Sequence, residues 1–274
     1  MAILPVPHGR ARRAVLGSLA LAAVGTPIAL ARAAASAGTT TAGKPAAGKA
    51  PKLVWSPSPL VDGLNAFEGV EDDRAHTDPH AKHIYVKNGV YHWDMPRRER
   101  DTSHDRQRNE VKGMRSGRTM LTMGNGETWR ITYDLFIPST LHGTSHFTHI
   151  HQLKRPGPGS APLVTMSLRR NGKTEELALR SFASGGDIGA TALAPLRDHW
   201  ISVDITYLIG NKGAAHFILT DGGKTVIDRA RTGIDIWLGD RIRPKWGIYR
   251  SVQCAPTDLI DTFMEIRNFK AFHG

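Results

Sequence analysis

Three short segments carry side chains suited to ionic and acid–base chemistry at alternate positions. They are residues 106–112 (RQRNEVK), 149–151 (HIH) and 245–249 (KWGIY). Because successive side chains of a β-strand point to opposite faces, one set of alternate positions can line a cleft while the other packs in a core. This alternation predicts a cationic groove that also contains histidine and tyrosine. The predicted lining is Arg106, Arg108, Glu110, Lys112, His149, His151, Lys245 and Tyr249.

Such a groove suits β-elimination on a uronic-acid polymer. The difficult step is removal of the C5 proton, alpha to the C6 carboxylate, and cationic groups near that carboxylate stabilise the enolate-like charge that develops. A base takes the proton and an acid protonates the departing O4, roles that His and Tyr can fill without a cofactor. Ordinary glycoside hydrolysis fits less well, because it usually requires a pair of Asp or Glu residues.

The elements that must position these side chains are short strands. Strand-like stretches cover residues 83–86, 90–93, 108–113, 128–137, 148–153, 163–169, 175–180, 200–207, 216–220, 225–229, 246–249 and 263–272. Asn88-Gly89, Asn171-Gly172 and Asp221-Gly222-Gly223 between them are hairpin signals. Many short strands joined by tight turns predict an all-β fold, an antiparallel β-sandwich or jelly roll, with the groove on a concave face.

The N-terminal region has the composition of an export signal and a tether. The pair Arg12-Arg13 precedes a modest apolar stretch and a run of small residues, which favours a twin-arginine-type signal peptide over residues 1–35. A membrane anchor is the alternative, but Gly25 and Pro27 break an apolar run that is already short. Residues 36–52 predict a disordered linker and residues 53–274 one domain. We expect an exported, periplasmic or extracellular protein without stable membrane insertion after signal removal.

The charge distribution points to an anionic partner other than nucleic acid. The chain carries a formal net charge of +11, but residues 1–52 contain seven Lys/Arg and no Asp or Glu, which leaves +4 for the predicted domain. Eight Lys/Arg between residues 97 and 118 create a local positive field. The single cysteine, Cys254, excludes an intrachain disulfide framework. An acidic polysaccharide is the expected partner, bound by a monomer.

The three segments also stand in the order of the motifs of jelly-roll polysaccharide lyases. The alginate-lyase pattern R-[ST]-E-[LV]-R is similar to residues 108–112, its Q-[IV]-H to residues 149–151, and its Y-x-K-x-G-x-Y-x-Q to residues 243–251. The form KWGIYR at residues 245–250 resembles more closely the K-x-G-I-Y-R of heparin lyase I and related bacterial lyases. The resemblance covers residues 60–272 in layout and implies a concanavalin-like β-jelly roll.

Carried over position by position, the resemblance implies a role for each groove residue. Arg108 would contact the substrate carboxylate and His151 would neutralise it or act as general base. Tyr249 would donate the proton, or serve as both base and acid. His149 stands where the alginate enzymes have Gln and would donate a hydrogen bond to the carboxylate, while Glu110 would orient a neighbouring cation. The remaining substrate-binding residues would be Arg106, Lys112, Lys245 and Arg250.

The predicted activity is cleavage of an acidic, uronate-containing polysaccharide, leaving a 4,5-unsaturated sugar at the new end. The departure at His149 and the K-x-G-I-Y-R form favour glucuronate-type chains, such as glucuronan or a glycosaminoglycan-like polymer, over alginate. A non-catalytic carbohydrate-binding sandwich is the main alternative, and a secreted glycoside hydrolase is a weaker one.

Each assigned residue also has a structural interpretation. Arg108 and Lys112 could form a solvated strand face, His149 and His151 could be structural histidines, and Tyr249 could be a core tyrosine whose hydroxyl is bonded.

A metal site is a further alternative, because His142, His146, His149 and His151 lie within ten residues. No obvious carboxylate or cysteine completes a ligand set. The sequence therefore predicts no metal at the site and no required cofactor, and leaves a structural calcium elsewhere in the sandwich open.

Overall fold

A computed structural model describes residues 51–97, 101–157 and 160–274 of the chain. The predicted signal (1–35) and most of the predicted linker (36–50) lie outside the described residues. The strands are β1 (Lys52–Trp55), β2 (Gly69–Glu71), β3 (Ile84–Lys87), β4 (Val90–Met95), β5 (Arg106–Lys112), β6 (Met114–Ser116), β7 (Thr119–Leu121), β8 (Thr128–Phe136), β9 (Thr148–Lys154), β10 (Val164–Asn171), β11 (Thr174–Ser181), β12 (Asp187–Ala192), β13 (Trp200–Leu208), β14 (Gly213–Asp221), β15 (Lys224–Ile234), β16 (Arg243–Ser251) and β17 (Thr262–His273). One short helix, α1 (Pro59–Asp62), and three 3₁₀ turns, Gly63–Ala66, Ala194–Leu196 and Pro256–Asp258, complete the described elements.

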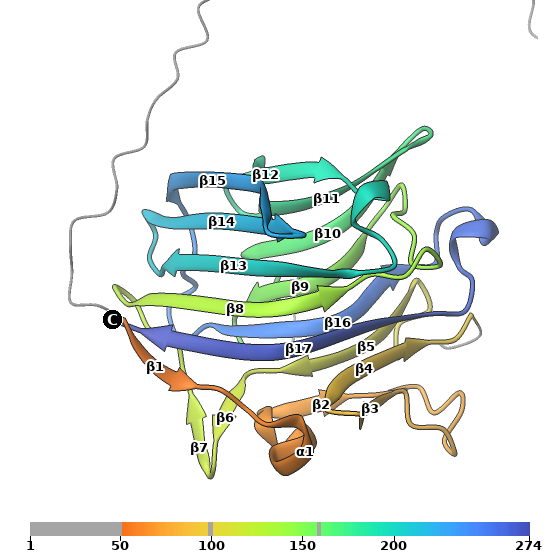
Figure 1. The fold of residues 1–274 in the computed structure, drawn as a ribbon, viewed down its shortest axis with the longest axis horizontal. Coiled ribbons are helices and arrows are strands. Elements are labelled where there is room, and N and C mark those ends of the chain that lie inside the picture. Colours follow the sequence, from red (N-terminus) through yellow and green to blue (C-terminus); the bar gives the residue numbers. More distant parts are fainter. Residues whose placement is uncertain (1–50, 98–100, 158–159) are drawn as a thin grey trace, which may run out of the picture. The chain divides into compact units, whose positions relative to one another are not determined.

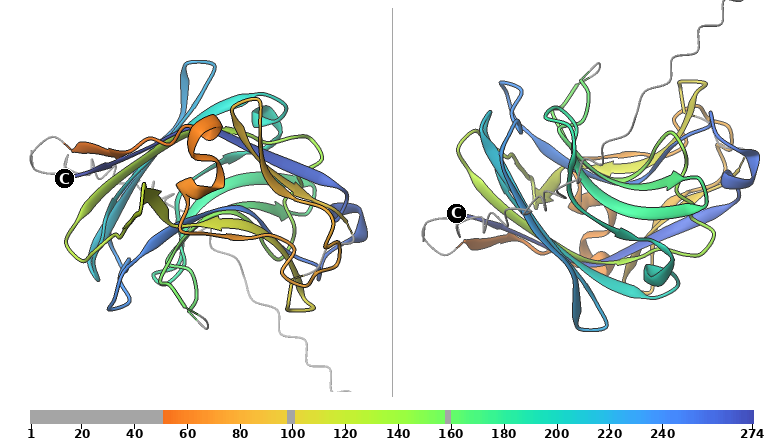
Figure 2. Two further views of the ribbon diagram at one scale, coloured as in Figure 1. Left: turned by 90° about the horizontal axis from the view of Figure 1, so that it is seen from below. Right: turned by 90° about the horizontal axis from the view of Figure 1, so that it is seen from above.

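The strands form two antiparallel sheets packed face to face, which confirms the predicted jelly-roll sandwich (Figures 1 and 2). One sheet has the order β15-β14-β13-β8-β17-β4-β3, with β1 paired to β17, and the other has the order β12-β11-β10-β9-β16-β5-β2. Strands β6 and β7 form a separate hairpin. Because β9, β16 and β5 are neighbours, the fold brings the three segments singled out in the sequence side by side.

All twelve predicted strands are present, and the local signals that predicted them act as expected. Asn88 and Gly89 both have positive φ (53° and 75°) in the turn between β3 and β4, as a type I′ hairpin turn requires. The structure adds β1, β2, β6, β7 and β12, which are short or lack a clear alternation. Lys52, placed at the end of the predicted linker, is the first residue of β1 and pairs with His273.

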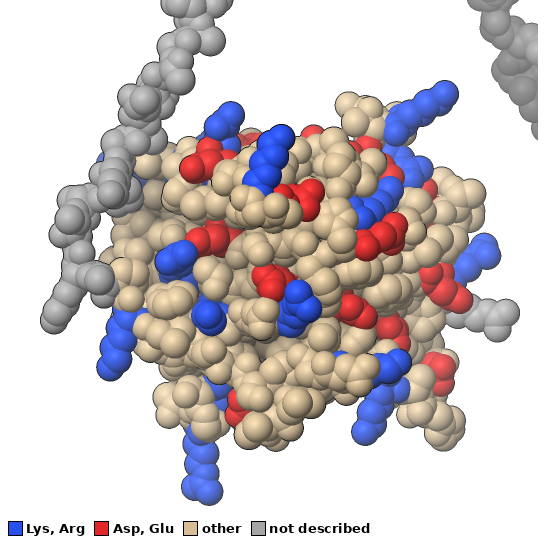
Figure 3. Space-filling model, in the orientation of Figure 1, with Lys and Arg blue, Asp and Glu red and all other residues tan. Residues whose placement is uncertain are grey.

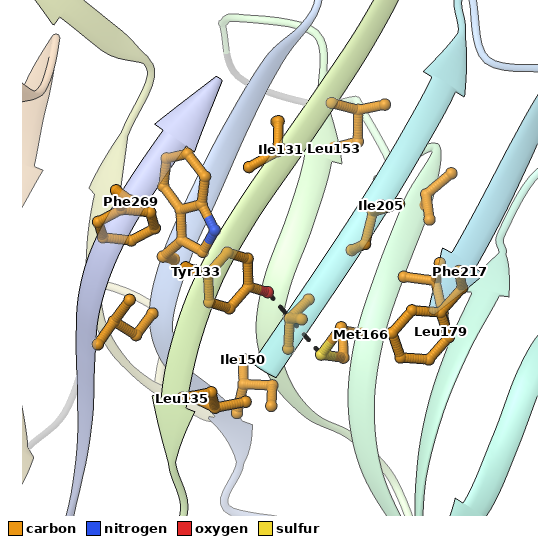
Figure 4. Close-up of a cluster of buried hydrophobic side chains, with 14 of the residues drawn as sticks. Ile131, Tyr133, Leu135, Ile150, Leu153, Met166, Leu179, Ile205, Phe217 and Phe269 are labelled. Carbon is orange, nitrogen blue, oxygen red and sulfur yellow. Dashed lines mark hydrogen bonds between the residues drawn. The ribbon is translucent and has the colours of Figure 1, made fainter. Parts of the chain in front are cut away.

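The core lies between the two sheets and consists of aliphatic and aromatic side chains (Figure 4). Trp246 of β16 is fully buried and its ring lies 4.8 Å from that of Phe269 and 5.9 Å from that of Trp55. Burial of side chains of this size contributes about 2 kcal/mol each relative to exposure. The core therefore holds β16, and with it the groove side chains on the opposite face of that strand, in a fixed position.

The outer face of the eight-stranded sheet carries both signs of charge in alternation (Figure 3). Arg130 pairs with Asp204 at 2.6 Å and Arg267 with Asp134 at 3.4 Å. This mixed surface contrasts with the cationic lining of the groove on the other sheet. Among the residues that the structure describes, no helix is long and apolar enough to cross a bilayer.

Candidate active site

A cleft of about 750 Å³ lies on the seven-stranded sheet, over β2, β5, β9 and β16. Seven cationic side chains and two carboxylates line it together with one tyrosine. The lining residues are Glu71, Arg74, Asp101, Thr102, Ser103, Arg106, Arg108, Lys112, Gln152, Lys154, Gly157, Ser160, Ala161, Pro162, Arg243, Lys245 and Tyr249. Seven of the residues predicted from the sequence are therefore on the groove side of the sheet: five line the cleft, Glu110 lies in its floor, and His149 lies beside Tyr249.

Strand register places the predicted side chains opposite one another. Tyr249 of β16 pairs with Arg108 of β5 on one side and with His149 of β9 on the other. Four residues earlier, Lys245 pairs with Lys112 and Gln152. The regular alternation of β5 and β16 thus produces the mixed cationic and aromatic face that the sequence predicted.

Tyr249 is held by two arginines at the groove surface. Arg106 donates from Nη1 to the Tyr249 hydroxyl oxygen at 2.6 Å, and its own position is fixed by a two-pronged ion pair with Asp105. The guanidinium carbon of Arg108 lies 4.3 Å from the centre of the Tyr249 ring, a cation–π distance. The hydroxyl is therefore held at the cleft surface by one guanidinium group, while a second lies over the ring.

His149 lies beside Tyr249 with their ring centres 5.7 Å apart. Its Nδ1 is 2.7 Å from the Ser167 hydroxyl of β10. Burial lowers the pKa of His149 from 6.5 to about 4, so the imidazole is neutral at pH 7. A neutral ring at this position can donate or accept one hydrogen bond at the edge of the cleft.

A buried ionic network underlies the cleft. The Glu110 carboxylate, only 1% exposed, is contacted by the Lys245 ammonium, by Nε2 of Gln152 and, at 3.8 Å, by Nε of Arg108. Asp101, equally buried, pairs with Arg108 at 3.3 Å and with Arg74 at 3.4 Å. Buried carboxylates of this kind fix the cations above them, since breaking one pair would leave an uncompensated charge. Glu110 thus orients Lys245 and Arg108, rather than Lys112.

His151 does not face the groove, and the prediction that it shares a face with His149 is wrong. Its side chain has no exposed surface, and its ring contacts Tyr207, Tyr133 and Trp246 in the core. The cause is a β-bulge in β9: His151 pairs with Met166 of β10 while His149 pairs with the adjacent Ser167, so both Ile150 and His151 point inward (Figure 4 shows Ile150 in the core).

Inside the core, His151 is a fully bonded structural histidine. Its Nδ1 lies 3.1 Å from the Lys245 carbonyl oxygen, which can only accept, so Nδ1 carries the proton. Its Nε2 then accepts from the Tyr207 hydroxyl at 3.0 Å. Burial lowers the pKa of His151 to about 3, although the bond to the carbonyl opposes the shift. A group in this environment cannot contact a polymer in the groove.

Arg250 also lies away from the cleft, contrary to its predicted substrate contact. It follows Tyr249 directly and therefore points to the opposite face of β16. It has no exposed surface and donates to the Gln107 side chain at 2.7 Å and to the Ile260 carbonyl at 3.0 Å. Its position indicates a scaffold role that joins β16 to β5 and to the loop before β17.

Several cleft residues were not predicted from the sequence. Gln152 and Lys154 reach the groove because the bulge reverses the phase of β9 after Ile150. Glu71 lies on β2, a three-residue strand too short to show alternation, and Arg74 and Asp101 come from loops. The position of Lys154 could have been predicted from the sequence, because Leu153 is apolar and, if it packs in the core, the next side chain of the strand must point to the groove.

The clustered histidines do not converge. His142 lies 3.4 Å from Glu175, His151 is in the core, and His149 is in the groove. Within residues 51–97, 101–157 and 160–274, no group of three or more His, Cys, Asp or Glu side chains is arranged to hold a metal ion.

Comparisons with known proteins identify the fold. No protein-family model and no curated protein matches the chain. Among solved structures, the chain is similar to a variant of the family 7 alginate lyase A1-II′ in complex with product (GGG) (TM-score 0.54, 14% identity, 81% of this chain and 100% of that chain). It is also similar to alginate lyases from Klebsiella pneumoniae (0.52, 14%, 80% and 99%) and Pseudomonas aeruginosa (0.51, 13%, 77% and 99%). At these identities the comparison establishes a shared jelly-roll fold.

Proposed function

We propose that this protein is a polysaccharide lyase that cleaves a uronate polymer by β-elimination in the cleft over β2, β5, β9 and β16. The observation that carries the proposal is the Tyr249 hydroxyl, which lies in a cation-lined groove 2.6 Å from Arg106 Nη1. The structural neighbours named above are themselves described as alginate lyases, which supports a substrate of the same chemical class.

Tyr249 is the proposed proton-transfer group. A uronate whose C5 lies beside this hydroxyl would bring its C6 carboxylate within reach of Arg106. With Tyr249 acting as a phenolate base, its oxygen takes the C5 proton, the electron pair of the C5–H bond becomes the second C4–C5 bond, and the C4–O4 bond breaks. The departing O4 then takes a proton from the Tyr249 hydroxyl, which restores the phenolate. The charge that develops on the carboxylate is stabilised by Arg106 and Arg108, which are already fixed by Asp105 and Asp101.

His149 is proposed as the neutral partner of Tyr249. The lowered pKa of His149 keeps its imidazole uncharged at neutral pH. The ring can therefore donate a hydrogen bond to the substrate carboxylate or to the Tyr249 oxygen without itself becoming protonated. The role first predicted for His151 as base passes to Tyr249 in this proposal, since Tyr249 is the groove residue at the required position.

A glycoside hydrolase mechanism is disfavoured by the charge state of the cleft carboxylate Glu71. A glycosidase requires one carboxylic acid with a raised pKa as proton donor. Burial alone would raise the pKa of Glu71, but Lys245, Arg108 and Lys112 outweigh it and hold that pKa at about 2. Glu71 is therefore ionised at any pH at which such an enzyme would work.

Glucuronate-type polymers are the proposed substrates within the uronate class. This choice rests on the KWGIYR form at residues 245–250 and on histidine rather than glutamine at position 149. We also propose that the protein is exported by the twin-arginine route, acts as a monomer, and needs no cofactor for the proton transfers assigned above.

The test is ultraviolet absorbance of the conjugated product during incubation with glucuronan, desulfated heparin, heparin, hyaluronan, alginate and polygalacturonate. Wild type should give rising absorbance on at least one polymer. Tyr249→Phe should lower the rate at least about 100-fold with little change in polymer affinity. Tyr85→Phe is the matched control, because it removes a hydroxyl bonded to Asp94 in the other sheet. Binding without absorbance on any polymer would instead favour a carbohydrate-binding sandwich.

A further inference from the structure

Three cations of the cleft converge on one carboxylate of the chain itself. Glu71 Oε2 lies 2.6 Å from the Lys245 ammonium and 3.7 Å from Nη1 of Arg108, and its Oε1 lies 3.4 Å from the Lys112 ammonium. The Glu71 side chain is 15% exposed and lines the cleft, so it lies where a polymer would bind. It occupies a place at which an anionic group of a ligand would meet three cations.

The local chain is built to make this arrangement. Glu71 ends β2, the edge strand that pairs with β5, and its Cα is opposite that of Glu110. Two residues earlier, Gly69 pairs with Lys112, and a Cβ at Gly69 would lie 2.6 Å from Cε of that lysine. The missing side chain leaves the Lys112 stem room to cross β2 and reach the Glu71 carboxylate.

The remaining cleft cations are mostly compensated in the same way. The lining cations are Arg74, Arg106, Arg108, Lys112, Lys154, Arg243 and Lys245. The carboxylates that pair with them are Glu68, Glu71, Asp101, Asp105 and Glu110. Within the described part of the chain, Lys154 is the lining cation with no carboxylate inside 4.0 Å. Five carboxylates thus face the seven lining cations, although Glu68 is shared with Arg241 outside the lining, so the net positive charge of the cleft is far less than the cation count suggests.

We infer that Glu71 is a specificity determinant that restricts the cleft to polymers whose only anions are carboxylates and disfavours sulfated polymers. The inference rests on the proposed function for its substrate class. A sulfate placed near Lys245, Lys112 or Arg108 would also lie near the Glu71 carboxylate, and like charges within a few ångströms repel strongly in a partly buried site. Glu71 thus weakens the binding of densely sulfated polymers, while Lys154 and Arg106 remain on the cleft surface to bind a substrate carboxylate.

The experiment compares binding of heparin with binding of chemically desulfated heparin, which share a backbone and differ in sulfate. The quantity measured is the ratio of the two dissociation constants for the full chain. Glu71→Gln should shift this ratio toward heparin by about tenfold, a change of the size expected for one charge within a cluster. Glu176→Gln is the matched control, since it removes the same charge from an ion pair with Arg169 outside the cleft and should leave the ratio within about twofold.

Lys112→Gln provides a second variant with the opposite expectation, because it lowers the positive charge around Glu71 and should shift the ratio toward the desulfated polymer. Thermal unfolding of each variant verifies folding. A ratio for Glu71→Gln equal to that of wild type would overturn the inference and leave Glu71 as scaffold, whatever the ratio for Lys112→Gln. Absence of an absorbance rise with wild type, together with the predicted shift in ratio, would refute lyase activity while upholding the selectivity of the groove.

Discussion

Replacement of His151 by glutamine separates the structural role seen here from the catalytic role that the sequence suggested. Glutamine preserves both hydrogen bonds, because its amide nitrogen can donate to the Lys245 carbonyl and its oxygen can accept from the Tyr207 hydroxyl. It does not titrate. His151→Gln should therefore fold, retain turnover within about threefold at pH 7.5, and lose one component of the acid sensitivity of the protein.

The size of that component follows from the lowered pKa. In the unfolded chain His151 binds a proton as the pH falls through about 6.5, whereas in the folded protein it does so near pH 3. The stability that neutral His151 contributes is complete above pH 6.5 and is lost as the pH falls from 6.5 toward 3. Each pH unit in this window is worth about 1.4 kcal/mol, so wild type should lose about 3 kcal/mol more than His151→Gln between pH 7.5 and pH 4.5.

Denaturant unfolding of both proteins at pH 7.5, 5.5 and 4.5 measures this difference. Other titrating groups, including His149, are present in both proteins and cancel in the comparison. Parallel stability curves would refute the assignment of His151 as a neutral core histidine. Loss of turnover in a variant with unchanged stability would show that His151 acts on substrate after all.

Two further substitutions test the geometry of β16 and of the cleft. Gly247→Ala should destabilise the protein by about 3 kcal/mol, because Gly247 has φ +140° and an added Cβ would lie 2.0 Å from the Asn109 carbonyl oxygen. The measurement is the free energy of unfolding in denaturant, and a loss below about 0.5 kcal/mol would contradict that close approach. Lys154→Met should raise KM about tenfold with little change in kcat, because this ammonium is the uncompensated cation among the described cleft residues and would bind ground state and transition state alike. An unchanged KM would place the substrate carboxylates elsewhere.

The sequence predicted the fold well because the signals it depends on are local. Strand alternation and Asn-Gly or Asp-Gly-Gly turns identified twelve strands, and the structure contains all of them. No local pattern predicted that β9, β16 and β5, which are far apart in the sequence, pair with one another. The pairing was suggested by the order of three motifs, and the observed sheet order brings those motifs together as the resemblance implied.

The parts of the site that escaped prediction share a physical cause. Glu71 and Asp101 are carboxylates whose importance comes from the cations they meet in space, and neither β2 nor the loop before β5 has a period that would direct its side chains. Counting charges in the sequence overestimated the positive field for the same reason. The cleft is cationic in composition, but Glu71, Asp101 and Glu110 neutralise much of it from below.

The error at His151 was visible in the sequence as a conflict of phase. In residues 148–154, Ile150 and Leu153 are both apolar and both buried, yet three positions separate them, so a regular strand would turn one of them toward the groove. A bulge between them resolves the conflict, and its position decides which histidine is lost to the core. With Ile150 and His151 both inward, His149 remains beside Tyr249, and Gln152 and Lys154 enter the groove. The bulge therefore removes His151 from the groove and brings in Gln152 and Lys154. The Gln152 amide contacts Glu110, and the Lys154 ammonium has no carboxylate partner in the described chain; these two groups complete the polar floor of the cleft.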